Sequence, residues 1–228
     1  MADLQVSEDG YISSPLGQSS WANARGATTG TVTSNSANAD VVIAFHTAGR
    51  GSSDFRVTRT FMYFDTSGIN VTLADATLKL YGHTTTPSAD IIVVKSTAFG
   101  GDGGTSLAAG DMDSFDDSTP YSSEFTSFAS NTFNNISLNA TALADIKNND
   151  AFIICIMEHD HDFQNSAPSN TNKSAYWKNQ NNSTTSLRPD LVWNGLVGYS
   201  HDVCGLAAAN ISKVNSLATA GVGKISGT

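Results

Sequence analysis

Three things are scarce in this sequence: long apolar runs, cysteine and positive charge. No stretch of the 228 residues approaches the roughly 18 consecutive apolar residues that a membrane-spanning helix needs. Cys155 and Cys204 are too few for a disulfide framework or an all-cysteine zinc site, so we expect two free thiols. The first residues, Met1-Ala-Asp-Leu-Gln-Val-Ser7, lack the charged and apolar regions of a secretory signal, so we expect synthesis in the cytosol.

Charged side chains make up 14% of the chain, against about 25% in an average soluble protein. Lys and Arg together number 12 and Asp and Glu number 21, which gives a formal net charge of −9. Such a chain has no electrostatic basis for binding phosphate backbones or anionic lipid, so we expect neither nucleic acid nor membranes as partners. Ser, Thr, Asn and Gly take the place of the charged residues, which is typical of a β-rich protein with many turns.

Short β-type runs recur from residue 40 onward. In Ala76-Thr-Leu-Lys-Leu-Tyr81 the apolar positions alternate, so that Ala76, Leu78 and Leu80 share one face. Short strands with turn-rich links predict an all-β fold, a sandwich of antiparallel sheets over residues 1–195. The expected strands are 40–46, 60–64, 76–81, 91–94, 135–138, 151–157 and 191–193.

One short helix and two long loops interrupt this series. Asn139 can cap a helix over residues 140–147, in which Ala142 and Ile146 share a face. The polar links 13–39 and 159–186 are expected to be irregular surface loops.

The chain changes character after Trp193. Residues 203–213 and 214–224 align as an eleven-residue repeat, V-x-x-L-A-x-A-x-[IV]-x-K, which begins a third time at Ile225. The glycines within the repeats disfavour a free helix. So small a segment cannot bury its apolar positions against itself, so it either folds back on the sandwich or is completed by another subunit. We favour the second and interpret residues 196–228 as a docking arm.

The run Arg59-Thr-Phe-Met-Tyr-Phe-Asp-Thr-Ser-Gly-Ile69, followed by Ala74-Asp-Ala-Thr-Leu-Lys-Leu-Tyr81, resembles the signature R-x-x-x-x-F-D-[LT]-S-x-I … A-x-L-x-L-Y of DNRLRE-type domains. Those domains are jelly-roll sandwiches related to carbohydrate-binding modules. The stretches 135–146, 158–163 and 188–193 resemble the version in bacteriophage structural proteins, where the acidic stretch is often Glu-Tyr-Asp-Tyr-Asp, so His159 and His161 depart from it. The C-terminal repeat is similar to the V-N-G-V-A-x-A-x-I-x-K tails of phage and marine-virus proteins.

The two resemblances imply a non-enzymatic virion structural protein, assembled in the host cytoplasm, with a jelly-roll body. Within the particle we favour a capsid decoration or cement protein or a head fibre. Its partners would be further copies of itself and other virion proteins, either capsid or tail subunits. The residues expected to dock are Val203, Leu206, Ile211, Lys213, Val214, Leu217, Val222, Lys224 and Ile225.

The alternative is a carbohydrate-binding adhesion module, on a tail fibre or elsewhere, that binds host glycans. Aromatic side chains beside neutral hydrogen-bonding groups form such platforms. Trp21, Tyr176 and Trp177 lie in loop-like contexts and are the glycan-binding candidates.

Glu158-His-Asp-His-Asp162 is the densest group of ionisable residues. If the preceding strand continues, Glu158, Asp160 and Asp162 lie on one side of it and His159 and His161 on the other. We favour the interpretation that these charges belong to a solvated strand end and prevent edge-to-edge pairing. Three carboxylates on one side would alternatively hold a structural calcium ion, which takes such oxygen ligands. The two histidines with a third ligand could instead hold a transition metal.

Overall fold

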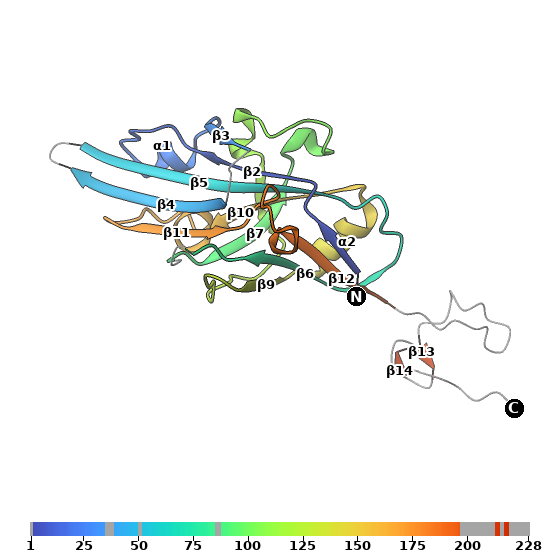
Figure 1. Cartoon of the computed structure of the whole chain (residues 1–228). Coiled ribbons are helices and arrows are strands. Elements are labelled where there is room, and N and C mark those ends of the chain that lie inside the picture. The colour runs from blue at the N-terminus through green and yellow to red at the C-terminus, as the bar shows by residue number, and fades with distance from the viewer. Residues whose placement is uncertain are drawn as a thin grey trace, which may run out of the picture.

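The computed structural model describes residues 2–34, 39–49, 52–84, 88–196, 213–214 and 217–218. Its regular structure is mainly β, in two antiparallel sheets (Figure 1). The strands are β1 (Ala2–Gln5), β2 (Glu8–Ser13), β3 (Thr31–Thr33), β4 (Asp40–Gly49), β5 (Ser52–Asp65), β6 (Leu73–Tyr81), β7 (Ile91–Ser96), β8 (Phe115–Pro120), β9 (Phe133–Ser137), β10 (Ala151–Glu158), β11 (Asn172–Trp177), β12 (Asp190–Gly195), β13 (Lys213–Val214) and β14 (Leu217–Ala218).

The smaller sheet has the order β1-β12-β6-β9, and the larger has the order β11-β4-β5-β10-β7-β8, with β2 beside β5 and β3 beside β2. The chain passes from one sheet to the other after β1, before and after β6, before and after β9, and before β12. The predicted all-β sandwich is confirmed. β13 and β14 pair only with each other among the described strands.

The main core lies between the two sheets. In β6, Ala76, Leu78 and Leu80 are buried. On the other face of the strand, Thr77, Lys79 and Tyr81 are half-buried. The three buried residues pack in one cluster with Phe152 and Ile154 of β10, from the larger sheet. The alternation in the sequence therefore predicted the correct core face.

A second core lies on the opposite face of the larger sheet. Ile153, Cys155 and Met157 of β10 belong to it, together with Trp21 of helix α1 (Trp21–Arg25) and residues of the turns that cover this face. Because β10 is buried on both faces, residues 151–157 are apolar at every position instead of alternating. Cys155 is a buried free thiol, as predicted, and Cys204 lies outside the described residues.

The predicted helix is confirmed as α2 (Ala140–Asn148). Its N-cap is Asn139, whose Oδ1 accepts a hydrogen bond from the backbone N–H of Ala142 at 3.1 Å. Ala142 and Ile146 are buried beneath it, as expected. No helix in the described part of the chain is long and apolar enough to cross a membrane.

The two polar links are more ordered than expected. The first contains α1 and β3, and the second contains β11, so the prediction of irregular loops was wrong for these elements. β11 forms because it pairs along its whole length with β4 and buries Ala175 and Trp177. Contact with a neighbouring strand therefore outweighs a polar local composition.

Candidate functional site

Arg59 and Asp162 form a fully buried ion pair in the second core. Arg59 lies in β5 and shares a face with Val57 and Phe61, both of which belong to that core. Asp162 lies in a π-helical turn, His159–Phe163, directly after β10. The pair therefore joins a central strand to the covering layer.

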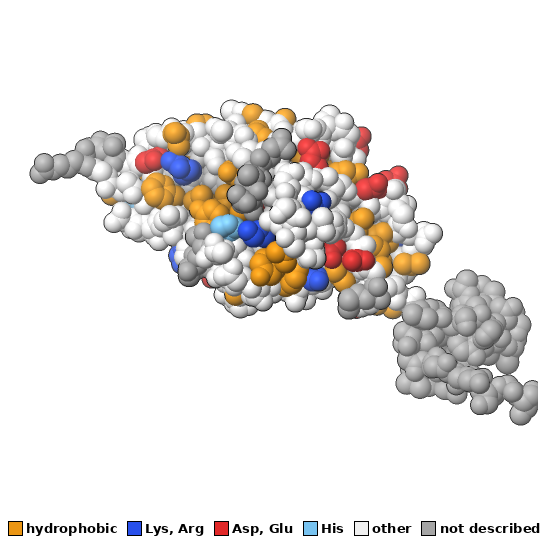
Figure 2. Space-filling model, viewed as in Figure 1, with side chains coloured by type: hydrophobic (Ala, Val, Ile, Leu, Met, Phe, Trp, Pro, Cys, Tyr) orange, Lys and Arg blue, Asp and Glu red, His pale blue; other side chains and the backbone are white. Residues whose placement is uncertain are grey.

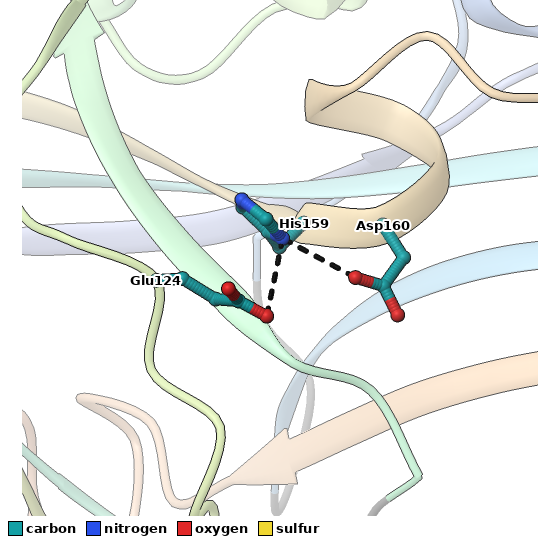
Figure 3. A group of neighbouring side chains, drawn as sticks. All are labelled: Glu124, His159 and Asp160. Atoms are coloured by element: carbon teal, nitrogen blue, oxygen red, sulfur yellow. Dashed lines mark hydrogen bonds and ion pairs between the residues drawn. The ribbon is translucent and has the colours of Figure 1, made fainter.

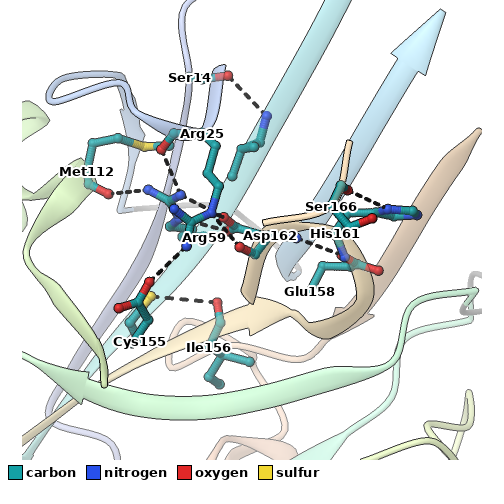
Figure 4. A network of polar contacts seen from close by, with 12 residues as sticks. Ser14, Arg25, Arg59, Met112, Cys155, Ile156, Glu158, His161, Asp162 and Ser166 are labelled. Atoms are coloured by element: carbon teal, nitrogen blue, oxygen red, sulfur yellow. Dashed lines mark hydrogen bonds and ion pairs between the residues drawn. The ribbon is translucent and has the colours of Figure 1, made fainter. Parts of the chain in front are cut away.

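The guanidinium of Arg59 binds the carboxylate of Asp162 through two parallel hydrogen bonds (Figure 4). Nε donates to Oδ2 at 2.8 Å and Nη2 donates to Oδ1 at 2.7 Å. Nη1 also donates to the carbonyl oxygen of Met112 at 2.9 Å, and Nη2 donates to that of Arg25 at 2.9 Å. Such paired, charge-assisted bonds are strong and directional. Both carboxylate oxygens of Asp162 are thus committed to the fold.

Further contacts close this network. Arg25, in α1, donates from Nε to the backbone oxygen of Asp162 at 2.6 Å and pairs through Nη2 with Asp117 in β8 at 2.8 Å. The ring of Phe115 lies 4.3 Å from the guanidinium carbon of Arg59. Burial alone would lower the pKa of Arg59, but the charge of Asp162 more than offsets this and leaves that pKa raised. The network ties α1, β5, β8 and the turn after β10 together.

The acidic stretch does not continue β10. The strand ends at Glu158, whose Oε2 accepts the backbone N–H groups of His161 at 2.7 Å and Asp162 at 3.1 Å, so Glu158 caps the turn. Because the backbone turns here, Glu158 and Asp162 are enclosed within the protein while Asp160 is partly exposed. The predicted grouping of Glu158, Asp160 and Asp162 on one side of a strand, around calcium, is therefore wrong.

Asp160 belongs instead to a small cluster with Glu124 and His159 (Figure 3). Nδ1 of His159 lies 3.3 Å from Oε1 of Glu124 and 3.3 Å from Oδ1 of Asp160. The His159 ring stacks on Phe163, with the ring centres 5.6 Å apart, which fixes its direction. Sequence reasoning missed Glu124 because it lies in the loop after β8, far from the acidic stretch.

One imidazole nitrogen and two carboxylate oxygens are ligands that divalent transition metals accept. The same three groups can also attract one another directly, as the two distances of 3.3 Å show. His161 does not join this cluster: its Nδ1 lies 2.9 Å from the carbonyl oxygen of Ser166. The predicted pairing of His159 with His161 around a metal is therefore not what the structure shows.

Two of the three predicted glycan-binding residues are in the core. Trp177 is 0% exposed and Trp21 is 7% exposed. A ring that is enclosed by protein offers no face to a sugar, so the prediction of a platform formed by Trp21 and Trp177 was wrong. Trp177 ends β11 and Trp21 begins α1, so neither lies in an open loop. Tyr176 is half-buried, so it is the member of the set that solvent partly reaches.

A polar hollow of about 480 Å³ lies beside β7, β10 and the end of α2. Asp145 lies in its wall, where its Oδ2 accepts hydrogen bonds from Nζ of Lys95 at 2.9 Å and from the hydroxyl of Tyr121. Burial and the bond to Asp145 raise the pKa of Tyr121, so its hydroxyl keeps its proton. These three side chains bind one another and thereby fix α2 against the larger sheet.

Three of the predicted docking residues lie within the described part of the chain. Lys213 and Val214 form β13 and Leu217 lies in β14, with Lys213 opposite Ala218. These four residues form two antiparallel β pairs and not a helix. We expected no free helix here, because glycines interrupt the repeats. The other six docking residues lie outside the described residues: Val203, Leu206, Ile211, Val222, Lys224 and Ile225.

No protein-family model matches the chain, and no curated protein matches it significantly. The resemblance to DNRLRE-type domains and to phage tails therefore stays a prediction, carried by the residues quoted for it.

Proposed function

We propose that this protein is a non-enzymatic structural protein of a bacteriophage particle, in which the sandwich is the body and residues 196–228 attach it to neighbouring subunits. A capsid decoration or cement protein, or a head fibre, is the role that we favour. The proposal rests on one contrast. The last strand of the body is paired on both edges, whereas the sequence that follows it is an apolar repeat.

The body is closed without the arm. β12 ends at Gly195 and has β1 on one side and β6 on the other, so both of its edges are paired. Among the described residues, the large hydrophobic side chains that are exposed are few: Leu16, Val71 and Leu196. Figure 2 shows charged side chains scattered over a mainly neutral surface. Few large apolar side chains of the described body are therefore exposed, whereas the repeat that follows it in the sequence is rich in Val, Leu and Ile.

The residues that carry the resemblance support a structural role. Arg59 is held by Asp162, and Phe64, Leu78 and Leu80 are in the main core. Each is used to build the body, so the signature marks a fold and not a site for substrate.

Deleting residues 197–228 tests the proposal. The truncated protein should keep the circular dichroism spectrum and the melting temperature of the full chain. Full-length protein should self-associate in light scattering and be incorporated into particles when supplied in trans, and the truncated protein should do neither. A matched control replaces Ser212, Asn215 and Ser216 by Ala, which keeps every apolar position of the repeat and should preserve assembly. Equal incorporation of the truncated and full-length proteins would contradict the proposal.

A further inference from the structure

Two aspartates are buried in the body, and no Lys or Arg side chain forms an ion pair with either of them within the described residues. Asp9 lies in β2 and Asp40 begins β4, and each is 1% exposed. Asp9 is opposite Met62 and Asp40 is opposite Trp177, and both of these partners belong to the main core. Opposite residues of an antiparallel pair lie on the same face. Both carboxylates therefore lie on the inner face of the larger sheet.

Most of the carboxylate oxygens of this pair lack a hydrogen-bond partner. Oδ2 of Asp9 accepts the backbone N–H of Gln180 at 2.8 Å. Oδ1 of Asp9 and both oxygens of Asp40 are buried and accept no hydrogen bond within the described part of the protein. The two carboxyl groups interact with each other, and the buried side chain of Asn179 interacts with Asp40. Carboxylates from β2 and β4 and the amide of Asn179, in the segment after β11, thus meet at one place.

The charge at this place needs a counterpart. The other charged groups that act on Asp9 are Glu8, which adds to its negative charge, and Arg188. Nε of Arg188 donates to the carbonyl oxygen of Asn182 at 3.0 Å, so this guanidinium is partly engaged elsewhere. An unpaired buried carboxylate is strongly unfavourable in free energy. A proton shared by the two carboxylates would make one O–H···O bond but would leave one negative charge buried at this place.

We propose that the carboxylates of Asp9 and Asp40 bind a calcium ion, with the side chain of Asn179 beside them. The donors are all oxygen, whereas zinc prefers nitrogen and sulfur ligands. They come from two different strands, β2 and β4, which suits the irregular and flexible coordination of calcium better than the strict octahedron of magnesium. Backbone carbonyl oxygens and water complete calcium sites of this kind.

The position of the ion gives it a structural role. It joins β2 and β4 to the segment between β11 and β12, where Gln5 already bonds to Thr185 at 2.9 Å and the backbone N–H of Val6 bonds to Pro189 at 3.1 Å. Calcium would fix that segment and with it the start of β12, the last strand of the body. This inference is independent of the role in a particle, since it concerns the body alone.

The test uses the full chain after treatment with EDTA and dialysis. At about pH 7.5, calcium chloride at 100 times its dissociation constant should raise the melting temperature by roughly 5–10 °C. Asp40→Asn removes one carboxylate and keeps the shape of the side chain, so this variant should fold and lose the shift. Asp9→Asn should also fold and lose the shift, so it replaces Asp40→Asn in the test if that variant does not fold. Asp160→Asn, in the exposed cluster with Glu124 and His159, is the matched control and should keep the full shift.

Terbium, which replaces calcium, gives a second readout. Trp177 lies opposite Asp40 on the neighbouring strand, so excitation of tryptophan should sensitise terbium emission from a bound ion. The emission should be displaced by calcium and should be absent in Asp40→Asn. A wild-type protein with neither a calcium shift nor sensitised emission would overturn the proposal and leave the shared proton as the explanation. The proposal would also be overturned if Asp160→Asn lost both the calcium shift and the terbium emission while Asp40→Asn kept both. The ion would then bind at the cluster of Glu124, His159 and Asp160.

Discussion

Asp162→Asn should be among the most destabilising single-atom changes in the body. The substitution keeps the size of the side chain and one hydrogen-bond acceptor for Arg59. It removes the charge that compensates a guanidinium with 0% of its side chain exposed, and it turns an amide N–H₂ toward an N–H donor.

The magnitude follows from the burial of the pair. Breaking a buried ion pair by removing one partner costs about 3–5 kcal/mol. The retained acceptor places Asp162→Asn near the lower end, at about 3 kcal/mol, which for a body of this size lowers the melting temperature by roughly 6–12 °C. Urea unfolding followed by circular dichroism measures the free energy directly. Limited proteolysis should also cut α1 and the turn around Met112 faster, because Arg59 holds both segments through their carbonyl oxygens.

Asp54→Asn is the matched control for the charge. Asp54 pairs with Arg56 at 3.7 Å, but both side chains are 34% exposed. An exposed pair contributes little, so this variant should lie within about 0.5 kcal/mol of wild type. If Asp162→Asn loses no more than Asp54→Asn, the buried pair does not hold the covering layer, and our reasoning is refuted.

Three further predictions concern other parts of the body. Burial raises the pKa of Asp9 from 3.8 to about 6. Without calcium, the folded protein therefore keeps a proton on Asp9 between about pH 4 and pH 6, where the unfolded chain loses that proton. Stability should then fall by on the order of 3 kcal/mol as the pH rises from about 4 to above 6, a slope that Asp9→Asn reduces in urea unfolding. Asn139→Ala removes the N-cap of α2 and should cost about 1 kcal/mol in the same assay. Gly103 has φ of +77° and a Cβ there would lie 2.3 Å from Cζ of Tyr63, so Gly103→Ala should lower the free energy of unfolding by about 1–3 kcal/mol.

The sheets and α2 could be predicted because their signals are local. Alternation in 76–81 identifies a strand with one buried face, and Asn139 before an apolar stripe identifies a helix start. β11 could not be predicted in this way, because its stability comes from pairing with β4, which is far away in the sequence. The two buried faces of β10 were visible as an unbroken apolar run, but the run alone does not say what covers the second face.

The prediction of a metal site depended on the direction of the backbone after β10, which the sequence alone does not determine. Assuming that β10 continues placed Glu158, Asp160 and Asp162 together, whereas the capping bonds of Glu158 turn the chain and send Asp162 to Arg59. The acidic stretch 158–162 is therefore important for the structure. Its carboxylates cap a turn and hold Arg59 instead of binding a metal ion. The aromatic residues failed for a related reason, since the polar neighbours of Trp177 conceal a side chain that is fully buried.

A usable signal for the buried aspartate pair does exist in the sequence. Aspartate is depleted in strands, because its short charged side chain neither packs on a pleated surface nor leaves water easily. Asp9 and Asp40 nevertheless begin or enter strands whose next inward positions are apolar, as Asp40-Val-Val-Ile shows. An aspartate at an inward strand position needs a partner, and two of them in one body can supply each other's partner only through a proton or a cation. The number of inward acidic residues without a basic counterpart is therefore a sequence-level criterion for cation sites in β-sandwiches, and the calcium titration of Asp40→Asn tests it in this protein.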